Sequence, residues 1–199
     1  MRQRPPLRCC SRNCWLAIDR VVKVGGALLA DAGRLDAVLA IVARAARSQR
    51  LVIVPGGGRF ADAVRETDRT LKLSDYAAHW MAILAMDQYA YLIVDRLEEG
   101  TLVHEAAAIG AALDARRIPV LAPSRWLRAV DPLPHSWDVT SDSIAAWLAG
   151  AMDAADLTLV KAANSAGDLV DAYFHRALPA GVRWSAVSAE QLDEHPDFR

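Results

Sequence analysis

Short apolar runs rich in β-branched residues alternate with longer segments whose apolar residues recur at helical spacing, and this alternation limits the folds open to the chain. Each of the short runs is bounded by turn residues, which is typical of buried strands: RVVKV (20–24), LVIV (51–54), IPVLA (118–122) and DLTLV (156–160). Helices are expected between and after them, over 34–48, 60–67, 75–97, 104–115 and 141–150. Strand–helix–strand succession requires crossover connections, so the sequence predicts an α/β fold, a three-layer αβα sandwich with a mainly parallel central sheet. A last apolar piece at 182–187 is expected to add an edge strand.

Size and charge narrow the function. With 199 residues, 53% of them hydrophobic, the chain can bury one large core, and we expect a single domain over 18–199. Because 23 Lys and Arg stand against 24 Asp and Glu, the overall charge predicts neither a nucleic-acid nor a membrane partner. No apolar run approaches the roughly 20 residues of a membrane-spanning helix. We therefore expect a cytoplasmic protein that acts on a small molecule.

The first 17 residues differ in composition from the rest. They are rich in arginine, contain a proline pair and carry all three cysteines, Cys9, Cys10 and Cys14. Cysteines confined to one end exclude a disulfide framework and suit a reducing compartment. Since Cys10 and Cys14 lack the common two-residue spacing of zinc sites, we interpret 1–17 as a basic, disordered leader and predict no metal-ligating residues.

Two glycine-rich loops follow two of the expected strands. The first strand continues into Gly25 and Gly26, and the second ends in PGGGRF, with Gly56, Gly57 and Gly58. Glycines after a strand let backbone amides approach an anion, and the following helix adds its positive N-terminal end. Ordinary turns are the alternative. Two such loops in one chain favour phosphate binding, although neither the P-loop nor the dinucleotide-binding spacing is present.

Lys23 interrupts an otherwise apolar strand just before the first glycine pair. A buried lysine is costly unless an anion meets it, and the adjoining loop is where a phosphate would lie. A lysine that extends along the strand end to water is the alternative.

Three stretches, VVKVGGALL, LVIVPGGGRFADAVR and WDVTSDSIAAWLA, resemble the amino acid kinase superfamily, which includes acetylglutamate, uridylate and isopentenyl phosphate kinases. The likeness covers about residues 20–162. LPHSWDVTSDSIAAWLA and DAYFHRAL are most similar to the methanofuran-biosynthesis branch, found in methanogens and methylotrophs. Its kinase converts aminomethylfuran-methyl phosphate to the diphosphate with ATP. The resemblance implies an amino acid kinase-like fold, ATP and Mg²⁺ as cofactors and a phosphorylated small-molecule substrate.

The resemblance also implies roles for individual residues. Lys23 would bridge donor and acceptor phosphates, and the five loop glycines would hold the transferring and acceptor phosphoryl groups. Asp142, at the start of the 141–150 helix, would organise the catalytic lysines, and Lys161 would help neutralise the donor phosphates. From the residues alone, Thr140 or Ser141 is a good N-cap, and simple helix capping explains Asp142 equally well.

Candidate acceptor-binding residues lie around these motifs. Arg59 directly follows the triple glycine and could hold a phosphate. Trp137 and His135, with Asp138, precede the 141–150 helix, and a furan ring suits an aromatic wall with a hydrogen-bonding neighbour. His79 lies in the 75–97 helix, where an apolar face at helical spacing is equally consistent with core packing.

The chain departs from the family pattern after the strand at 156–160. Many members have about 50 residues more, chiefly where the nucleotide base binds, and here a short NSAGD turn follows instead. Asp168 and Asp171 could line a reduced adenine pocket, or merely belong to a turn.

Two hypotheses for the function result. The first is an ATP-dependent kinase, with a phosphate monoester preferred over a carboxylate as acceptor; the second is a non-catalytic nucleotide- or oxyanion-binding subunit. Exposed apolar helix surface predicts a homo-oligomer.

Overall fold

A computed structural model describes residues 18–163 and 169–198. The leader at 1–17 and the whole NSAGD turn at 164–168, which ends in Asp168, therefore lie outside the described residues. Six strands form one sheet in the order β3-β4-β2-β1-β5-β6, and every pair of neighbours is parallel. The strands are β1 (Arg20–Val24), β2 (Leu51–Pro55), β3 (Gly100–Val103), β4 (Ile118–Leu121), β5 (Asp156–Lys161) and β6 (Arg183–Ser188). This arrangement confirms the predicted α/β class.

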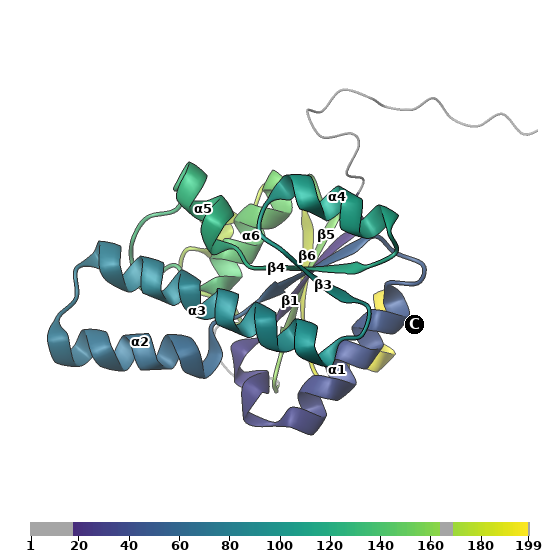
Figure 1. Ribbon diagram of the computed structural model, residues 1–199, viewed down its shortest axis with the longest axis horizontal. Coiled ribbons are helices and arrows are strands. Elements are labelled where there is room, and N and C mark those ends of the chain that lie inside the picture. The colour runs from purple at the N-terminus through teal and green to yellow at the C-terminus, as the bar shows by residue number, and fades with distance from the viewer. Residues whose placement is uncertain (1–17, 164–168, 199) are drawn as a thin grey trace, which may run out of the picture.

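Helices cover both faces of the sheet (Figure 1). They are α1 (Ala32–Ala45), α2 (Gly58–Leu71), α3 (Asp75–Arg96), α4 (Ala106–Asp114), α5 (Ser124–Val130), α6 (Ser141–Ala151) and α7 (Phe174–Ala177), with short 3₁₀ turns η1 (Gly26–Ala30), η2 (Leu192–Glu194) and η3 (Pro196–Phe198). The core on one face joins the sheet to α1 and the second half of α3. The core on the other joins it to α4, α6 and α7. The result is a three-layer αβα arrangement.

The alternation of β1 places its one lysine toward α6. Val22 and Val24 pack into the core beside α1, whereas Val21 belongs to the core beside α6. Because successive side chains of a strand point to opposite faces, Lys23 shares its face with Val21. The lysine is therefore directed into the layer that carries Asp142.

Apart from the 3₁₀ turns, the structure adds three elements that the sequence pattern did not indicate. β3 forms the second edge of the sheet between two expected helices, α5 follows shortly after β4, and α7 precedes β6. Helix α2 also continues to Leu71, beyond the expected end at 67. Its strongly polar composition obscured the end of the helix. With the first half of α3 it forms a helical hairpin that extends away from the sheet (Figure 1).

The C-terminal segment is anchored at the amino end of β1. The Arg20 guanidinium donates to the Thr158 hydroxyl at 2.7 Å and lies 2.9 Å from the Asp197 carboxylate and 3.5 Å from that of Asp156. Phe198 is fully buried beside α1. These contacts fix the last turns against the sheet, far along β1 from the glycine loops.

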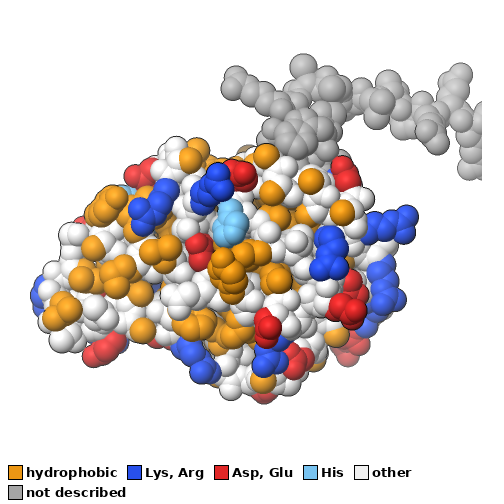
Figure 2. Space-filling model, viewed as in Figure 1, with side chains coloured by type: hydrophobic (Ala, Val, Ile, Leu, Met, Phe, Trp, Pro, Cys, Tyr) orange, Lys and Arg blue, Asp and Glu red, His pale blue; other side chains and the backbone are white. Residues whose placement is uncertain are grey.

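Part of α3 is apolar and exposed. Met81, Leu84 and Tyr91 are 37, 41 and 60% exposed, and apolar side chains gather on the surface shown in Figure 2. This surface is available for association with another chain, and the homo-oligomer stays a prediction. None of the helices in the described ranges has the length and apolar character needed to cross a membrane.

Candidate functional site

The loops that follow β1 and β2 meet the end of β5 at the carboxyl edge of the sheet. From β1 the chain proceeds to β2 and β4 on one side and later returns to β5 on the other. Ligands of open parallel sheets bind where the strand order reverses in this way. The candidate site therefore lies around the ends of β1 and its two neighbours.

The two glycine loops are in backbone contact with each other. A Cβ atom added at Gly26 would lie 2.2 Å from the Gly58 nitrogen, and one added at Gly56 would lie 2.6 Å from the Gly26 nitrogen. Gly58 also has a φ of 52°, in the left-handed region that glycine adopts at least cost. The close approach of the two loops therefore leaves no room for side chains at these positions. Glycine is required here whether or not a ligand binds.

The five glycines have different roles. The Gly25 amide donates to the Val160 carbonyl at 2.9 Å and the Gly56 amide to the Val24 carbonyl at 2.8 Å, so both extend the sheet's hydrogen bonding. Gly26, Gly57 and Gly58 instead line a cavity. Gly57 is the N-cap of α2, whose positive end suits an anion. The structure therefore brings three of the five glycines to the wall of the cavity.

Asp142 bridges two lysines. Its Oδ1 lies 2.7 Å from Lys23 Nζ, and its Oδ2 accepts a hydrogen bond from Lys161 Nζ at 2.6 Å. Lys23 and Asp142 are buried, and the Lys161 side chain is 21% exposed. Oδ1 has an ion pair but no well-oriented hydrogen bond among the described residues. The cluster holds two cations and one anion.

The pKa shifts follow from this crowding. Burial lowers the pKa of Lys23; Asp142 opposes this shift, whereas Lys161 adds to it. Burial alone would raise the pKa of Asp142, but the two ammonium groups outweigh it and hold that pKa below its usual value. Asp142 is thus charged at neutral pH, and further negative charge would stabilise the lysines.

Asp171 positions the helix that carries Asp142. Its carboxylate accepts hydrogen bonds from the Thr140 amide at 2.9 Å, the Thr140 hydroxyl at 2.6 Å and the Ser143 amide at 3.0 Å, and contacts the Ser143 hydroxyl. Thr140 is the N-cap of α6, and its hydroxyl accepts from the Asp142 amide. The sequence alone suggested an adenine pocket or a turn for Asp171; the structure shows these capping contacts.

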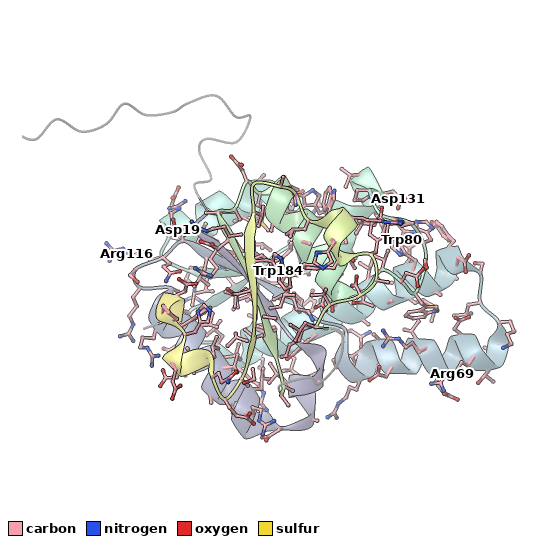
Figure 3. All side chains as sticks on the ribbon, turned by 180° about the vertical axis from the view of Figure 1, so that it is seen from behind. Asp19, Arg69, Trp80, Arg116, Asp131 and Trp184 are labelled. Carbon is pink, nitrogen blue, oxygen red and sulfur yellow. The ribbon has the colours of Figure 1, made fainter. Side chains whose placement is uncertain are left out.

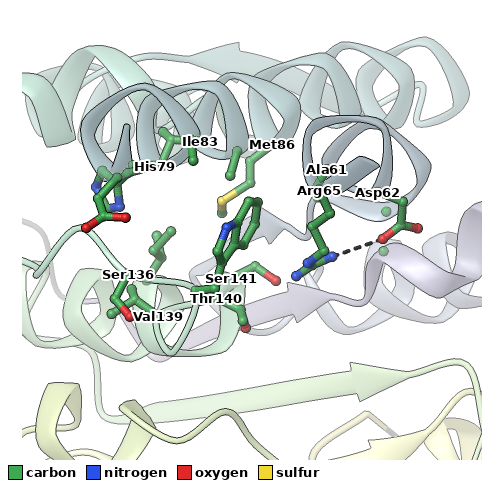
Figure 4. Close-up of a pocket in the computed structure, with 18 of the residues that line it drawn as sticks. Ala61, Asp62, Arg65, His79, Ile83, Met86, Ser136, Val139, Thr140 and Ser141 are labelled. Atoms are coloured by element: carbon green, nitrogen blue, oxygen red, sulfur yellow. Dashed lines mark hydrogen bonds and ion pairs between the residues drawn. The ribbon is translucent and has the colours of Figure 1, made fainter. Parts of the chain in front are cut away.

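A cavity of about 280 Å³ opens beside the glycines, between α2, α3 and the segment before α6 (Figure 4). Gly26 and Gly58 lie among its lining residues together with Thr140 and Ser141, the neighbours of Asp142. Met86, Ile83 and Trp137 supply apolar surface. The volume is near the lower end of the range for small-molecule pockets. Lys23 is not among the lining residues, because it is buried beneath them.

The candidate acceptor residues separate into two groups. His79 and Trp137 line the cavity, whereas Arg59 is exposed and donates to the Leu29 carbonyl at 2.7 Å. Arg65 lies further along α2 and lines the cavity instead. Its guanidinium pairs with Asp62 at 2.9 Å and lies 4.9 Å from the centre of the Trp137 ring. Its helical spacing from Gly58 was the signal that could have identified it.

His135 and Asp138 lie outside the cavity lining. Asp138 is exposed, and its carbonyl accepts from the Tyr173 amide at 3.3 Å. His135 stacks on His79 with ring centres 4.3 Å apart and contacts Asp131, near Trp80 (Figure 3). Burial, followed by the proximity of His135, lowers the pKa of His79 to about 4. The His79 imidazole is therefore neutral at pH 7.

The residues present suit a phosphate donor better than a dedicated Mg²⁺ cage. A glycine cradle that a Cβ would fill and two lysine ammoniums match phosphoryl oxygens. Asp142 is the carboxylate of this cluster, and both of its oxygens face lysines. Mg²⁺ in such sites is held largely by phosphate oxygens and water, which is compatible with this donor set.

The fold and the glycine–lysine site define a phosphate-handling α/β protein, and comparison with known proteins specifies the group. The model of the amino acid kinase family matches residues 20–165, and the chain belongs to this family. A curated protein of Methanocaldococcus jannaschii, (5-(aminomethyl)furan-3-yl)methyl phosphate kinase, is 30% identical over 141 residues, which are 70% of this chain. The match spans 63% of the length of that relative.

Solved structures agree on the fold. Uridylate kinase from Archaeoglobus fulgidus superposes with a TM-score of 0.58 at 18% identity, covering 78% of this chain and 70% of that one. UMP kinase from Ureaplasma parvum gives 0.57 at 15% identity, covering 74% and 68%. At such identities the likeness concerns the arrangement of the chain, and it confirms the amino acid kinase-like sandwich.

Proposed function

We propose that the chain is an ATP-dependent kinase whose acceptor is a phosphate monoester, aminomethylfuran-methyl phosphate, which it converts to the diphosphate in methanofuran-type cofactor biosynthesis. The observation that carries the proposal is the Lys23–Asp142–Lys161 cluster beside the glycine loops. It holds one more positive than negative charge in a buried position. The family match and the likeness to the archaeal kinase support the same reaction class.

Phosphoryl transfer requires no covalent bond between the protein and the transferring group. An acceptor phosphate oxygen forms a bond to the γ-phosphorus of ATP, the bond to the bridging oxygen breaks, and ADP leaves with that electron pair. The acceptor is already an anion, so it requires no general base. Mg²⁺, when bound, would neutralise charge on the donor phosphates.

The charged residues would stabilise the transferring group. Asp142 holds the Nζ atoms of Lys23 and Lys161 on either side of one carboxylate, and this fixes both ammoniums before substrate arrives. Preorganised charges of this kind stabilise developing negative charge without reorganisation during the reaction. Gly26, Gly57 and Gly58 would let the phosphoryl oxygens approach the backbone.

The cavity suits the proposed acceptor in size and polarity. Its glycine end lies next to the lysine cluster, while Trp137, Ile83 and Met86 offer apolar contact to a small ring. The Arg65 side chain stands on the Trp137 ring and is directed toward this space (Figure 4). We propose that Arg65, rather than Arg59, contacts the acceptor phosphate.

A non-catalytic nucleotide- or oxyanion-binding subunit is the second candidate. One observation favours it: Lys23 is 4% exposed and does not line the cavity. A kinase would need Lys23 to reach the phosphates when substrates bind.

The decisive experiment is an ADP-release assay with Mg-ATP and aminomethylfuran-methyl phosphate, beside UMP and a panel of carboxylates. We expect turnover with the furan phosphate, and a diphosphate product identified by phosphorus NMR. Lys23→Ala should lower kcat by about 10²- to 10³-fold, as the loss of one preorganised donor does in other enzymes.

Two results would overturn the assignment. Unchanged turnover in the Lys23→Ala variant would remove the proposed role of the cluster. Absence of turnover across the whole panel, with ATP binding still measurable by calorimetry, would favour the binding subunit. Arg59→Ala serves as the matched control, since its side chain faces the Leu29 carbonyl and should leave KM for the acceptor unchanged, whereas Arg65→Ala should raise it.

A further inference from the structure

Two histidines and an aspartate converge at the outer end of the cavity. His79 comes from the first turns of α3, Asp131 is the C-cap of α5, and His135 lies in the connection to α6. Asp131 Oδ1 lies 2.9 Å from His135 Nε2, and one ligand atom from each of the three residues falls within 4.8 Å of the others. The residues come from separate elements, so the convergence is a product of the fold.

We propose that His79, Asp131 and His135 form a binding site for one divalent transition-metal ion of the zinc class. Two imidazoles and one carboxylate are the donor set that zinc and its neighbours favour, and hard Mg²⁺ does not. Three protein ligands with one open position are typical of accessible rather than closed zinc sites. This site is separate from the lysine cluster and does not depend on the proposed kinase reaction.

The ligands have to contract around an ion. In a tetrahedral site, zinc–nitrogen bonds of about 2.1 Å place two ligand atoms about 3.4 Å apart. A pair of ligand atoms at the present limit of 4.8 Å therefore has to approach by roughly 1.4 Å. The His135 and Asp131 side chains are 21 and 49% exposed and can adjust, while His79 is nearly buried and fixed. Binding exchanges the Asp131–His135 contact for two bonds to the ion.

The surroundings contain a donor that is otherwise unused. Trp80 packs edge-on against His79 and His135, with ring centres 5.0 and 5.8 Å away. Its buried indole N–H has no hydrogen-bond acceptor among the described residues. A water or hydroxide in the open position of the ion would offer such an acceptor. The nearby Arg128 guanidinium is held over the Trp80 ring, 4.8 Å from its centre.

A bound ion would connect two walls of the cavity. His79 lines the cavity from α3, and His135 is two residues from Trp137, which lines it from the other side. Joining these elements through metal bonds would restrict the segment that leads to the Thr140 cap. The ion would then stabilise the fold and the acceptor end of the cavity together.

The test is zinc titration by calorimetry after chelator treatment. Because thiolates also bind zinc, the full chain is used with Cys9→Ser, Cys10→Ser and Cys14→Ser as the background. We expect one ion per chain, and an absorption spectrum of the cobalt form that indicates nitrogen and oxygen ligands. Asp131→Asn, His135→Ala and His79→Gln should each weaken affinity at least about tenfold, the least that disturbing a metal site usually costs.

His104→Gln and His175→Gln are matched controls, since neither belongs to the cluster, and both should bind zinc like the background. Equal affinity in the Asp131→Asn, His135→Ala and control variants would overturn the proposal, and so would an absence of saturable zinc binding once the cysteines are replaced. Asp131 is exposed, so its variant remains informative if His79→Gln fails to fold.

Discussion

Strand β1 has a buried cation near each end, and the two cations have different charged partners. At the amino end, Arg20 lies against the carboxylates of Asp197 and Asp156 and donates to Thr158. At the carboxyl end, Lys23 shares the single carboxylate of Asp142 with Lys161. The buried Arg20 guanidinium contacts two carboxylates, whereas two ammonium groups share the one carboxylate of Asp142.

The charge balance explains what each end can do. Around Arg20, Arg183 also pairs with Asp156, so two guanidiniums meet two carboxylates and the cluster is neutral. Such a cluster can hold the C-terminal turns in place but has no capacity for another anion. The lysine cluster keeps an excess positive charge. Burial lowers the pKa of Lys23, and the charge of Lys161 lowers it further. A phosphate is the kind of group that would complete it.

Removing the two cations should therefore change the free energy of unfolding by unequal amounts. Arg20→Met removes a buried cation from two carboxylates, of which Asp156 keeps Arg183 and Asp197 is 42% exposed, and we expect the free energy of unfolding to fall by about 1.5 to 3 kcal/mol. Lys23→Met leaves Asp142 paired with Lys161 and removes a disfavoured buried charge, so the change should remain within about 1 kcal/mol. Urea unfolding of both variants provides the measurement.

Arg183→Met is the control for Arg20→Met. Its side chain is 78% exposed, so it tests the same carboxylate without a buried cation, and it should cost less than about 1 kcal/mol. Comparable losses in Arg20→Met and Lys23→Met would mean that both clusters are structural, and the contrast between the ends of β1 would disappear.

Added anions should stabilise the fold by binding at the carboxyl end of β1, and not at its amino end. Pyrophosphate, an analogue of the phosphates of donor and acceptor, should raise the free energy of unfolding by about 2.7 kcal/mol at a hundred times its Kd. The Lys23→Met variant should lose most of this gain, whereas Arg59→Ala should retain it. Thermal unfolding over a pyrophosphate series measures the effect. A gain of the same size in the Lys23→Met variant would place the anion elsewhere.

Much of this architecture could be predicted from the sequence, because strands buried on both faces read as continuous apolar runs. The five expected strands are present, and Lys23, Asp142 and Lys161 lie in one cluster. β3 could not be foreseen from Gly100–Val103, since four residues at a sheet edge carry too little pattern. For the glycine loops the sequence favours phosphate binding over ordinary turns, and their contact with each other already excludes side chains at Gly26.

Side-chain placement around the cavity was less predictable. Arg59 and Arg65 are both arginines on α2, and only the orientation of the helix decides that Arg65 lines the cavity. Asp171 caps α6 from a distant segment, and such a long-range contact has no local signal. The His79–Asp131–His135 cluster likewise depends on the packing of α3 against the connection before α6, a tertiary arrangement that spacing along the chain cannot specify.

His79 extends the comparison to a third buried base. Burial and then His135 lower its pKa, Asp131 opposes them as the weakest of the three influences, and the resulting pKa is about 4. His79 therefore responds to burial by losing its proton at neutral pH. The unfolded chain takes up that proton near pH 6.5 and the folded chain does not, so stability must fall as the pH is lowered.

Between pH 7 and pH 5 the loss attributable to His79 should be roughly 1 to 2 kcal/mol, from the difference between an unfolded pKa near 6.5 and a folded pKa near 4. His79→Gln removes this contribution, so its stability should depend less on pH than that of the wild-type chain. Exposed His175 provides the matched control, and His175→Gln should follow the wild type. Chemical unfolding at the two pH values, with chelator present to exclude metal, measures the difference.

Identical pH dependence in the His79→Gln variant and the wild type would mean that His79 keeps its proton in the folded chain. Its neighbours would then compensate for burial as the carboxylates do around Arg20.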